Sequence, residues 1–275
     1  MPEISIKAET LFHIGSFAVN NSMVLSSLVF IFFIVFGALY FKESKKSENK
    51  SGLYYTLNLM LRPLYNLFHS IVHDKIDVFF PLLSALFLWI LIQNWSGLLP
   101  GVGSIMVAVR EPIKHEIVAT QTKNVSHAPK KAEAVGETKK EETEIKHIPL
   151  FRGNNADLNA TLALAIVTMV MVQVYGIQFL GLGAYLGKFI NLSNPINFFL
   201  GILEIMSEFS KVLSFAFRLF GNIFAGEVLL TIVAFLVPVL ASFPFLILEV
   251  FVGFVQALVF SMLTSVFFSM AVSKH

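Results

Sequence analysis

The chain has 275 residues, of which 56% are hydrophobic and only 14% are charged, and its mean hydropathy is +0.74. A soluble domain carries about 25% charged residues, so this composition predicts an integral membrane protein. The formal net charge of +2 gives no sign of a nucleic-acid partner, and the absence of cysteine excludes disulfides, thiol chemistry and cysteine-based metal sites.

The first expected membrane span covers residues 23–41. This apolar run is about 19 residues long, which is enough to cross a bilayer as a helix, and the polar run K-E-S-K-K-S-E-N-K follows it. A signal peptide would begin with a basic region, whereas Lys7 is the only Lys or Arg among residues 1–20. We therefore expect a retained transmembrane helix.

Residues 53–73 have a strongly amphipathic pattern. Apolar residues recur at helical spacing on one face, and Asn58, Arg62, Asn66, His69 and His73 share the other face. This pattern favours an interfacial helix over a span. The two histidines are four residues apart and could bind a metal ion, but no third ligand is near them in the sequence, so we prefer a solvated face.

The second expected span covers residues 79–99 and ends in the sequence N-W-S-G-L-L-P. Residues 104–153 are then rich in Lys and Glu and poor in apolar residues. Such a composition predicts a disordered or loosely ordered loop in solvent. A binding segment for a partner protein is the alternative.

The third expected span covers residues 158–180. Asp157 and Asn159 lie at its start, where Asp and Asn commonly stabilise the first turn of a helix. The glycine-rich stretch that follows, with Lys188 in it, indicates a connecting loop up to Pro195.

The last two apolar segments are unusually long. Residues 195–238 would extend about 64 Å as one helix at 1.5 Å per residue, although the hydrocarbon core is only about 30 Å thick. A break at Gly221 would leave too few residues for a second span. We therefore expect a continuous, steeply tilted helix over 196–237, and a second one over 243–272 that completes a hairpin.

Ionisable residues inside the first of these segments point to a function. Arg218 lies within apolar sequence, where a charge is costly and usually functional. Its neighbours three and four residues away include no carboxylate, so its counter-charge must come from another helix or another chain. The small residues Ser214, Gly221 and Ala225 flank it and would let a second helix approach closely.

Two groups of polar residues lie on either side of Arg218. Glu204, Glu208 and Lys211 precede it, with spacings of four and three residues that place them together on one helix face. Such a group could carry protons or could be an interfacial patch that screens its own charges. The second group consists of residues that follow Arg218 or belong to other segments: Asn222, Glu227, Glu249, Gln256, Asp157 and Asn159.

The sequence R-L-F-G-N-I-F-A-G-E, from Arg218 to Glu227, closely resembles the signature of the subunit a family of F-type ATP synthases. The N-W-S-G-L-L-P turn and A-D-L-N-A-T-L, which contains Asp157 and Asn159, also resemble segments of this family. The resemblance identifies residues 104–153 as an insertion. The implied fold is an all-α integral membrane protein in one domain, with about five transmembrane helices, one interfacial helix, and the last two spans as a tilted hairpin.

The resemblance implies the stator of a rotary motor. Protons would enter one half-channel, neutralise a carboxylate on the rotating ring of c subunits, and leave by a second, offset half-channel. The resemblance makes Arg218 the essential residue facing that ring. It places Glu227, Glu249, Gln256 and Asn222 on the side where protons enter, and Glu204 and Lys211 on the exit side. For Asp157 and Asn159 it raises an alternative to helix capping, that they border an aqueous path. It also implies b subunits as partners, and no cofactor.

Other functions are compatible with the same residues. A secondary transporter could use the same charges, but it should show internal repeats and broken helices, which are not evident. A scaffold for other subunits would not need charges at membrane depth. Arg218 could also form a structural ion pair with Glu249. The chain has no phosphate-binding G-x-x-x-x-G-K-[ST] motif and no catalytic triad, so we expect no ATP hydrolysis by this chain.

The expected location is a bacterial plasma membrane, with an organelle's inner membrane as the alternative. Six Lys and Arg residues within 42–77 favour a cytoplasmic position for that stretch, although the Lys-rich residues 104–153 then lie outside, against the positive-inside rule. We therefore adopt the orientation that the resemblance implies, with the N-terminus outside and the C-terminus in the cytoplasm.

Overall fold

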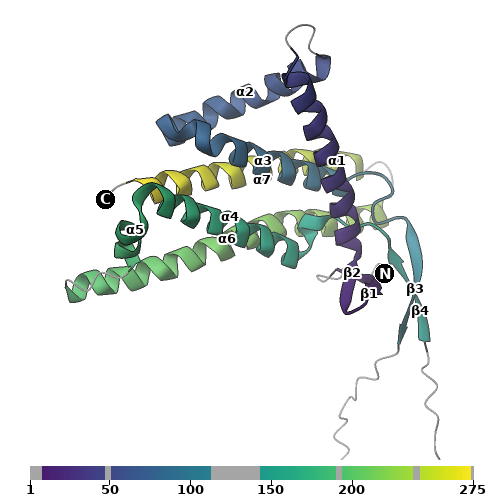
Figure 1. Ribbon diagram of the computed structural model, residues 1–275. Helices are drawn as coiled ribbons and strands as arrows, with labels where there is room; N and C mark the ends of the chain where they lie inside the picture. The colour runs from purple at the N-terminus through teal and green to yellow at the C-terminus, as the bar shows by residue number, and fades with distance from the viewer. Residues whose placement is uncertain (1–7, 47–50, 113–142, 190–193, 238–241, 274–275) are drawn as a thin grey trace, which may run out of the picture.

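The computed structural model describes residues 8–46, 51–112, 143–189, 194–237 and 242–273 (Figure 1). Most of them are helical. The helices are α1 (Asn21–Ser44), α2 (Gly52–Val72), α3 (Ile76–Gly97), α4 (Leu158–Leu180), α5 (Leu182–Phe189), α6 (Pro195–Leu236) and α7 (Ser242–Val272). Short 3-10 turns, η1 (His73–Lys75) and η2 (Asn154–Ala156), precede α3 and α4.

Five helical stretches of the described chain are long and apolar enough to cross a membrane. They are Asn21–Ser44, Tyr54–Gly97, Leu158–Leu180, Pro195–Leu236 and Ser242–Val272. The expected fold class, an all-α integral membrane protein, is confirmed.

The long helix α6 runs without a break from Pro195 to Leu236, as expected, with Pro195 in its first turn. Gly221 therefore does not interrupt it. Figure 1 shows α3, α4, α6 and α7 side by side, with α1 crossing them steeply. The steep tilt in the membrane and the interfacial position of α2 remain predictions.

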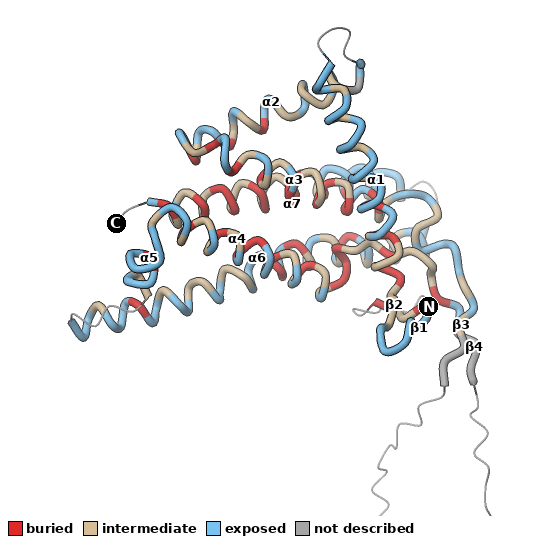
Figure 2. The backbone as a smooth tube through the Cα atoms, in the orientation of Figure 1, coloured by how far each residue is buried: buried red, intermediate tan, exposed pale blue. Residues whose placement is uncertain are grey.

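The hydrophobic core lies between α3, α4, α6 and α7. Figure 2 shows the buried residues concentrated on the facing sides of these helices, whereas α1 is largely exposed. Aromatic rings join the layers: Phe79 stacks on Phe268 at 4.7 Å between ring centroids, and Phe215 meets Phe260 edge-on at 4.6 Å. The first contact holds α3 against α7. The second holds α6 against α7, and so fixes which face of α6 is turned outward.

The expectation of a loosely ordered loop over residues 104–153 is wrong at both of its ends. These ends pair as an antiparallel hairpin of β3 (Met106–Pro112) and β4 (Thr143–Pro149), while residues 113–142 lie outside the described chain. The backbone N–H of Leu150 donates to the carbonyl of Ile105 at 2.8 Å, and Ile148 is buried. A few apolar side chains thus anchor a segment whose average composition is polar.

The prediction of a connecting loop after residue 180 is also wrong, because the helix α5 forms there. Tyr185 of α5 packs over Gly176 of α4, where a Cβ atom would come within 2.5 Å of its ring. The missing side chain makes room for the tyrosine and brings α5 against α4.

A second hairpin, of β1 (Thr10–Ile14) and β2 (Phe17–Asn20), precedes α1 and had no sequence prediction. Gly15 adopts a φ of 63° at its turn, a conformation that glycine takes without strain.

Candidate functional site

Arg218 lies on the exposed face of α6. Its Nη2 donates to Ser214 Oγ at 3.4 Å, one helical turn earlier. Within the described chain it forms no ion pair, and so none with Glu249. Phe215 and Leu219, on the neighbouring face of the helix, are buried. The cation is therefore presented outward, where a second helix could meet it.

A cavity of about 630 Å³, here called the Glu227 cavity, lies beside the C-terminal half of α6. Its walls come from the end of α3, the segments next to β3 and β4, the η2 turn, α6 and the start of α7. The charged side chains that line it are Arg152, Glu227 and Glu249. It brings together the two acids that the sequence analysis assigned to one site.

Arg152 was missed by the sequence analysis. It is buried, and its Nε lies 3.6 Å from Glu227 Oε1. It falls at the end of the stretch that composition marked as a solvated loop. The signal that could have found it is a lone arginine after an apolar residue, Phe151, a few positions before a membrane helix.

Glu249 reaches the same cavity from α7 and is only 7% exposed. Its carboxylate lies directly against Gly226 of α6, the residue before Glu227. The two acids thus sit on neighbouring helices at the same level.

Asn222 and Gln256 join α6 and α7 between this cavity and Arg218. Asn222 Nδ2 donates to Gln256 Oε1 at 2.7 Å, and Gln256 is buried. The Nε2 group of Gln256 is also buried and has no hydrogen-bond partner in the described chain. Neither residue lines the Glu227 cavity.

Asp157 caps α4. Its Oδ1 accepts a hydrogen bond from the backbone N–H of Asn159 at 3.0 Å, and its Oδ2 accepts one from Ser22 Oγ at 3.2 Å. Asp157 is buried and Asn159 is exposed, and neither lines the Glu227 cavity. The capping role is visible in these contacts, and a role in an aqueous path remains a prediction.

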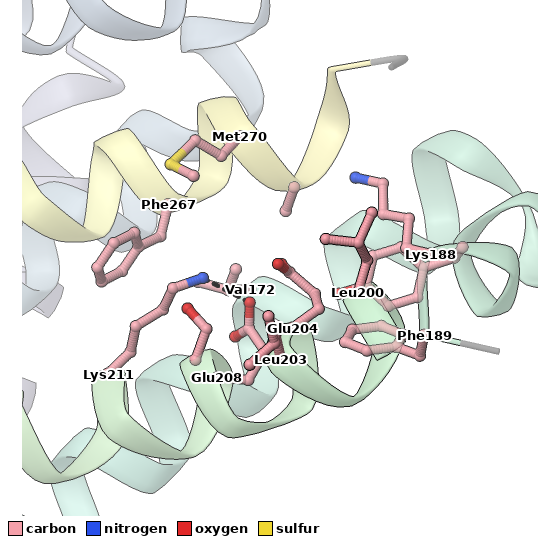
Figure 3. Close-up of a pocket in the computed structure, with 13 residues that line it drawn as sticks. Val172, Lys188, Phe189, Leu200, Leu203, Glu204, Glu208, Lys211, Phe267 and Met270 are labelled. Atoms are coloured by element: carbon pink, nitrogen blue, oxygen red, sulfur yellow. Dashed lines mark hydrogen bonds and ion pairs between the residues drawn. The ribbon is translucent and has the colours of Figure 1, made fainter. Parts of the chain in front are cut away.

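A second cavity of about 510 Å³, here called the Glu204 cavity, lies at the other half of α6 (Figure 3). Figure 3 shows Glu204 and Lys211 pointing from α6 into the space next to Phe267 and Met270 of α7. Lys188 of α5 lines the cavity as well, although the sequence analysis had placed it in a loop.

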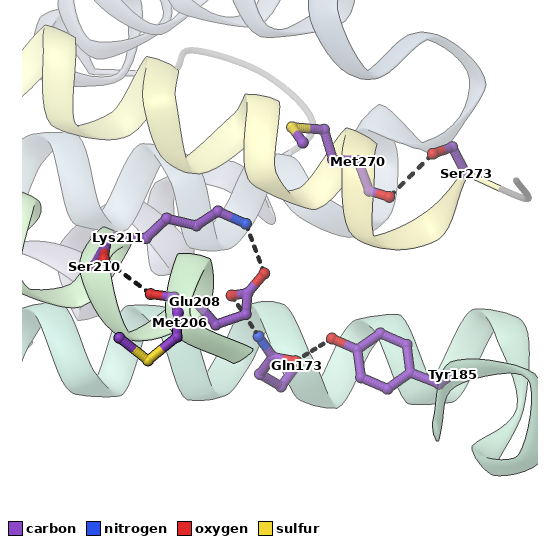
Figure 4. A network of polar contacts seen from close by, with 8 residues as sticks. All are labelled: Gln173, Tyr185, Met206, Glu208, Ser210, Lys211, Met270 and Ser273. Atoms are coloured by element: carbon purple, nitrogen blue, oxygen red, sulfur yellow. Dashed lines mark hydrogen bonds and ion pairs between the residues drawn. The ribbon is translucent and has the colours of Figure 1, made fainter. Parts of the chain in front are cut away.

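A chain of hydrogen bonds crosses the wall of the Glu204 cavity (Figure 4). The Tyr185 hydroxyl donates to Gln173 Oε1, and Gln173 Nε2 donates to Glu208 Oε2 at 2.8 Å. Lys211 Nζ donates to Glu208 Oε1 at 2.6 Å. Both oxygens of Glu208 are therefore engaged by donors, whereas Glu204 has no polar partner among the described residues.

The sequence analysis missed Tyr185 and Gln173 because they come from α5 and α4. Burial, followed by the nearby carboxylates of Glu208 and Glu204, raises the pKa of Tyr185 to about 12. The phenol therefore stays protonated at physiological pH and acts as a hydrogen-bond donor. The sequence left two interpretations of this cluster, a proton carrier or a patch that screens its own charges. Screening fits Glu208 and Lys211, which form an ion pair, but it does not fit Glu204, which has no polar partner among the described residues.

Arg218 separates the two cavities along α6. At 1.5 Å per residue, it lies about 10 Å from the level of Lys211 and about 13 Å from the level of Glu227. An ion moving from one cavity to the other along α6 would have to pass a fixed cation, and arginine is effectively never deprotonated.

The chain is similar in sequence to known proteins. The sequence pattern of a family described as ATP synthase A chain matches residues 22–269. A protein named ATP synthase subunit a from Moorella thermoacetica is 25% identical over 270 residues, which cover 98% of this chain and 99% of that protein. Another protein of the same name, from Desulforamulus reducens, is 36% identical over 130 residues, which cover 44% of this chain and 48% of that protein.

Proposed function

The chain belongs to the ATP synthase A chain family, and from this premise we propose that it is the fixed subunit through which protons reach and leave a rotating ring. It is a multi-pass membrane component of the Fo sector, which serves proton transport and ATP synthesis. In the proposed mechanism it performs no bond chemistry on ATP itself.

The observation that carries the proposal is the position of Arg218. It is exposed on α6, has no counter-charge in the described chain, and lies between two cavities that each contain carboxylates. An ionised carboxylate on a c subunit would supply the missing charge. The small residues Ser214, Gly221 and Ala225 would let the c-subunit helix approach closely.

On the uptake side, we propose that Glu227 and Glu249 take protons from the outside through the Glu227 cavity. Asn222 and Gln256 bridge the distance toward Arg218 and would pass protons on to the ring. A role for Asp157 and Asn159 in the uptake path stays a prediction, because the contact of Asp157 with the Asn159 N–H is that of a helix cap.

On the release side, protons leave the ring through the Glu204 cavity. Glu204 is the carboxylate without a described partner, which suits a group that gains and loses protons. Glu208 and Lys211 form an ion pair beside it and would keep the cavity hydrated and polar.

The proposed partners are the c-subunit ring, the b subunits of the peripheral stalk and the lipid bilayer. The proposed location is a bacterial plasma membrane, with the N-terminus outside and the C-terminus in the cytoplasm. The alternative of a secondary transporter is less well supported, because such proteins use discontinuous helices at the binding site, whereas α6 is continuous through Arg218.

The test is ATP-driven acidification of inverted membrane vesicles that contain the whole ATP synthase. We expect Arg218→Ala to abolish pumping at equal assembly of the complex. Arg62→Ala, which removes an exposed arginine of α2, is the matched control and should pump normally. Undiminished pumping by Arg218→Ala would reject the proposal.

A further inference from the structure

Arg152 is a buried cation in the wall of the Glu227 cavity, outside the motifs that carry the family resemblance. It follows β4 and precedes η2, and its Nε lies 3.6 Å from Glu227 Oε1. The Arg152 side chain is 9% exposed, whereas that of Glu227 is 43% exposed. The arginine is thus a fixed part of the wall, and the glutamate remains open to the cavity.

The backbone on both sides of Arg152 is held in place. The carbonyl of Phe151 accepts a hydrogen bond from the N–H of Gly103 at 3.1 Å, and the carbonyl of Gly153 accepts one from the N–H of Ala156 at 3.2 Å. Gly97 at the end of α3 passes close to Gly153, because a Cβ atom on Gly97 would lie 3.4 Å from the Gly153 Cα. Arg152 is therefore directed at Glu227 by ordered structure.

The charge balance of the cavity depends on this residue. Arg152 is the cation among the residues that line it, and Glu227 from α6 and Glu249 from α7 are the acids. The polar residues facing them from α3 are Gln93 and Asn94, which are neutral. Two carboxylates next to each other disfavour each other's ionisation, and a neighbouring guanidinium offsets this effect.

We propose that Arg152 is a positioning residue of the proton-uptake site, which orients Glu227 and keeps it ionised next to Glu249. The cavity then binds a proton weakly enough to pass it on. Without Arg152, the two acids would share a proton and hold it too tightly for rapid transfer toward the ring. This inference rests on the proposed function, in which Glu227 carries protons.

The experiment measures ATP synthesis by proteoliposomes that contain the whole ATP synthase. A fixed potassium diffusion potential drives synthesis while the lumenal pH, which the Glu227 cavity would face, is varied. For Arg152→Gln we expect a lower maximal rate of ATP synthesis. We also expect the rate to decline at alkaline lumenal pH with a midpoint roughly one pH unit higher than in the wild type, because one unit is the low end of the pKa effect of an adjacent opposite charge. Arg152→Lys should stay near the wild-type profile.

Arg62→Gln is the matched control, since it removes an exposed arginine remote from the cavity and should leave the profile unchanged. A wild-type pH profile for Arg152→Gln at equal assembly would overturn the inference. The proposed function fails separately, if Arg218→Ala retains proton-driven synthesis.

Arg152→Gln could instead fail to assemble, because it leaves Glu227 without its partner. The double variant Arg152→Gln, Glu227→Gln then distinguishes a pairing of the two charges from a role of Arg152 in packing alone. Restored assembly supports the pairing, because the double variant removes both charges together. Continued failure to assemble would show that Arg152 acts only through packing, which overturns the inference.

Discussion

Glu249 on α7 lies directly against Gly226 on α6, and a Cβ atom at position 226 would overlap the whole carboxylate group. The contact lets an acid from the last helix sit beside Glu227 of the preceding helix. The arrangement depends on the absence of a side chain, so it can be tested by adding one methyl group.

Gly226→Ala should therefore displace Glu249 and disturb the Glu227 cavity. Overpacking of this kind typically costs about 1–3 kcal/mol, and proton-driven ATP synthesis should fall with it. Gly37→Ala in α1 is the control, because a Cβ atom there has nothing within 4 Å. Equal synthesis rates for the two variants at equal assembly would show that the position of Glu249 does not matter.

Asp157 is expected to act as a helix cap. Asp157→Ala should lower the free energy of unfolding by about 1 kcal/mol, the usual cost of losing an N-cap side chain, and thermal unfolding of the purified complex would measure it. Asp157→Ser can still cap α4 but cannot titrate. If proton pumping by Asp157→Ser in well-assembled complexes is blocked, Asp157 belongs to the proton path after all.

Gln173 links Tyr185 to Glu208, so its replacement breaks two hydrogen bonds at once. Gln173→Leu leaves the buried Tyr185 hydroxyl without its acceptor, which should cost about 1–3 kcal/mol, and frees one oxygen of Glu208. We expect a lower unfolding temperature and slower ATP-driven pumping. Gln178→Leu, at an exposed position of the same helix, should match the wild type. Identical behaviour of the two variants would refute a role for the network.

The unfolding temperature should depend on pH at alkaline pH because of the buried Tyr185. The pKa of Tyr185 is raised from its ordinary value of 10.0 to about 12, so the folded state holds this proton more tightly than the unfolded state. Its stabilising effect is complete below pH 10.0 and is lost as pH rises toward about 12. Tyr185→Phe cannot ionise, so its unfolding temperature should fall less than that of the wild type over this range. Parallel curves would contradict the raised pKa.

The apolar stretches of the chain were predictable from the sequence, whereas parts of the polar stretches were not. Five helical stretches long and apolar enough to cross a membrane, with α6 unbroken among them, follow from length and hydropathy, because a bilayer demands long apolar helices whatever packs around them. The hairpin of β3 and β4 and the helix α5 were missed. In both places a few buried contacts, those of Ile148 and of Tyr185 over Gly176, override the local composition.

The sequence by itself determined that this is a membrane protein of the ATP synthase A chain family with an arginine inside the apolar sequence of α6, since these properties are local and can be seen in consecutive residues. Only the tertiary structure decided which charged and polar side chains come into contact, and with what. It placed Arg152 beside Glu227, Glu249 against Gly226, and Tyr185 and Gln173 behind Glu208. The reason is physical: ion pairs and hydrogen bonds depend on distances of a few ångströms between segments far apart in the chain, and those distances are set by the packing of helices against one another.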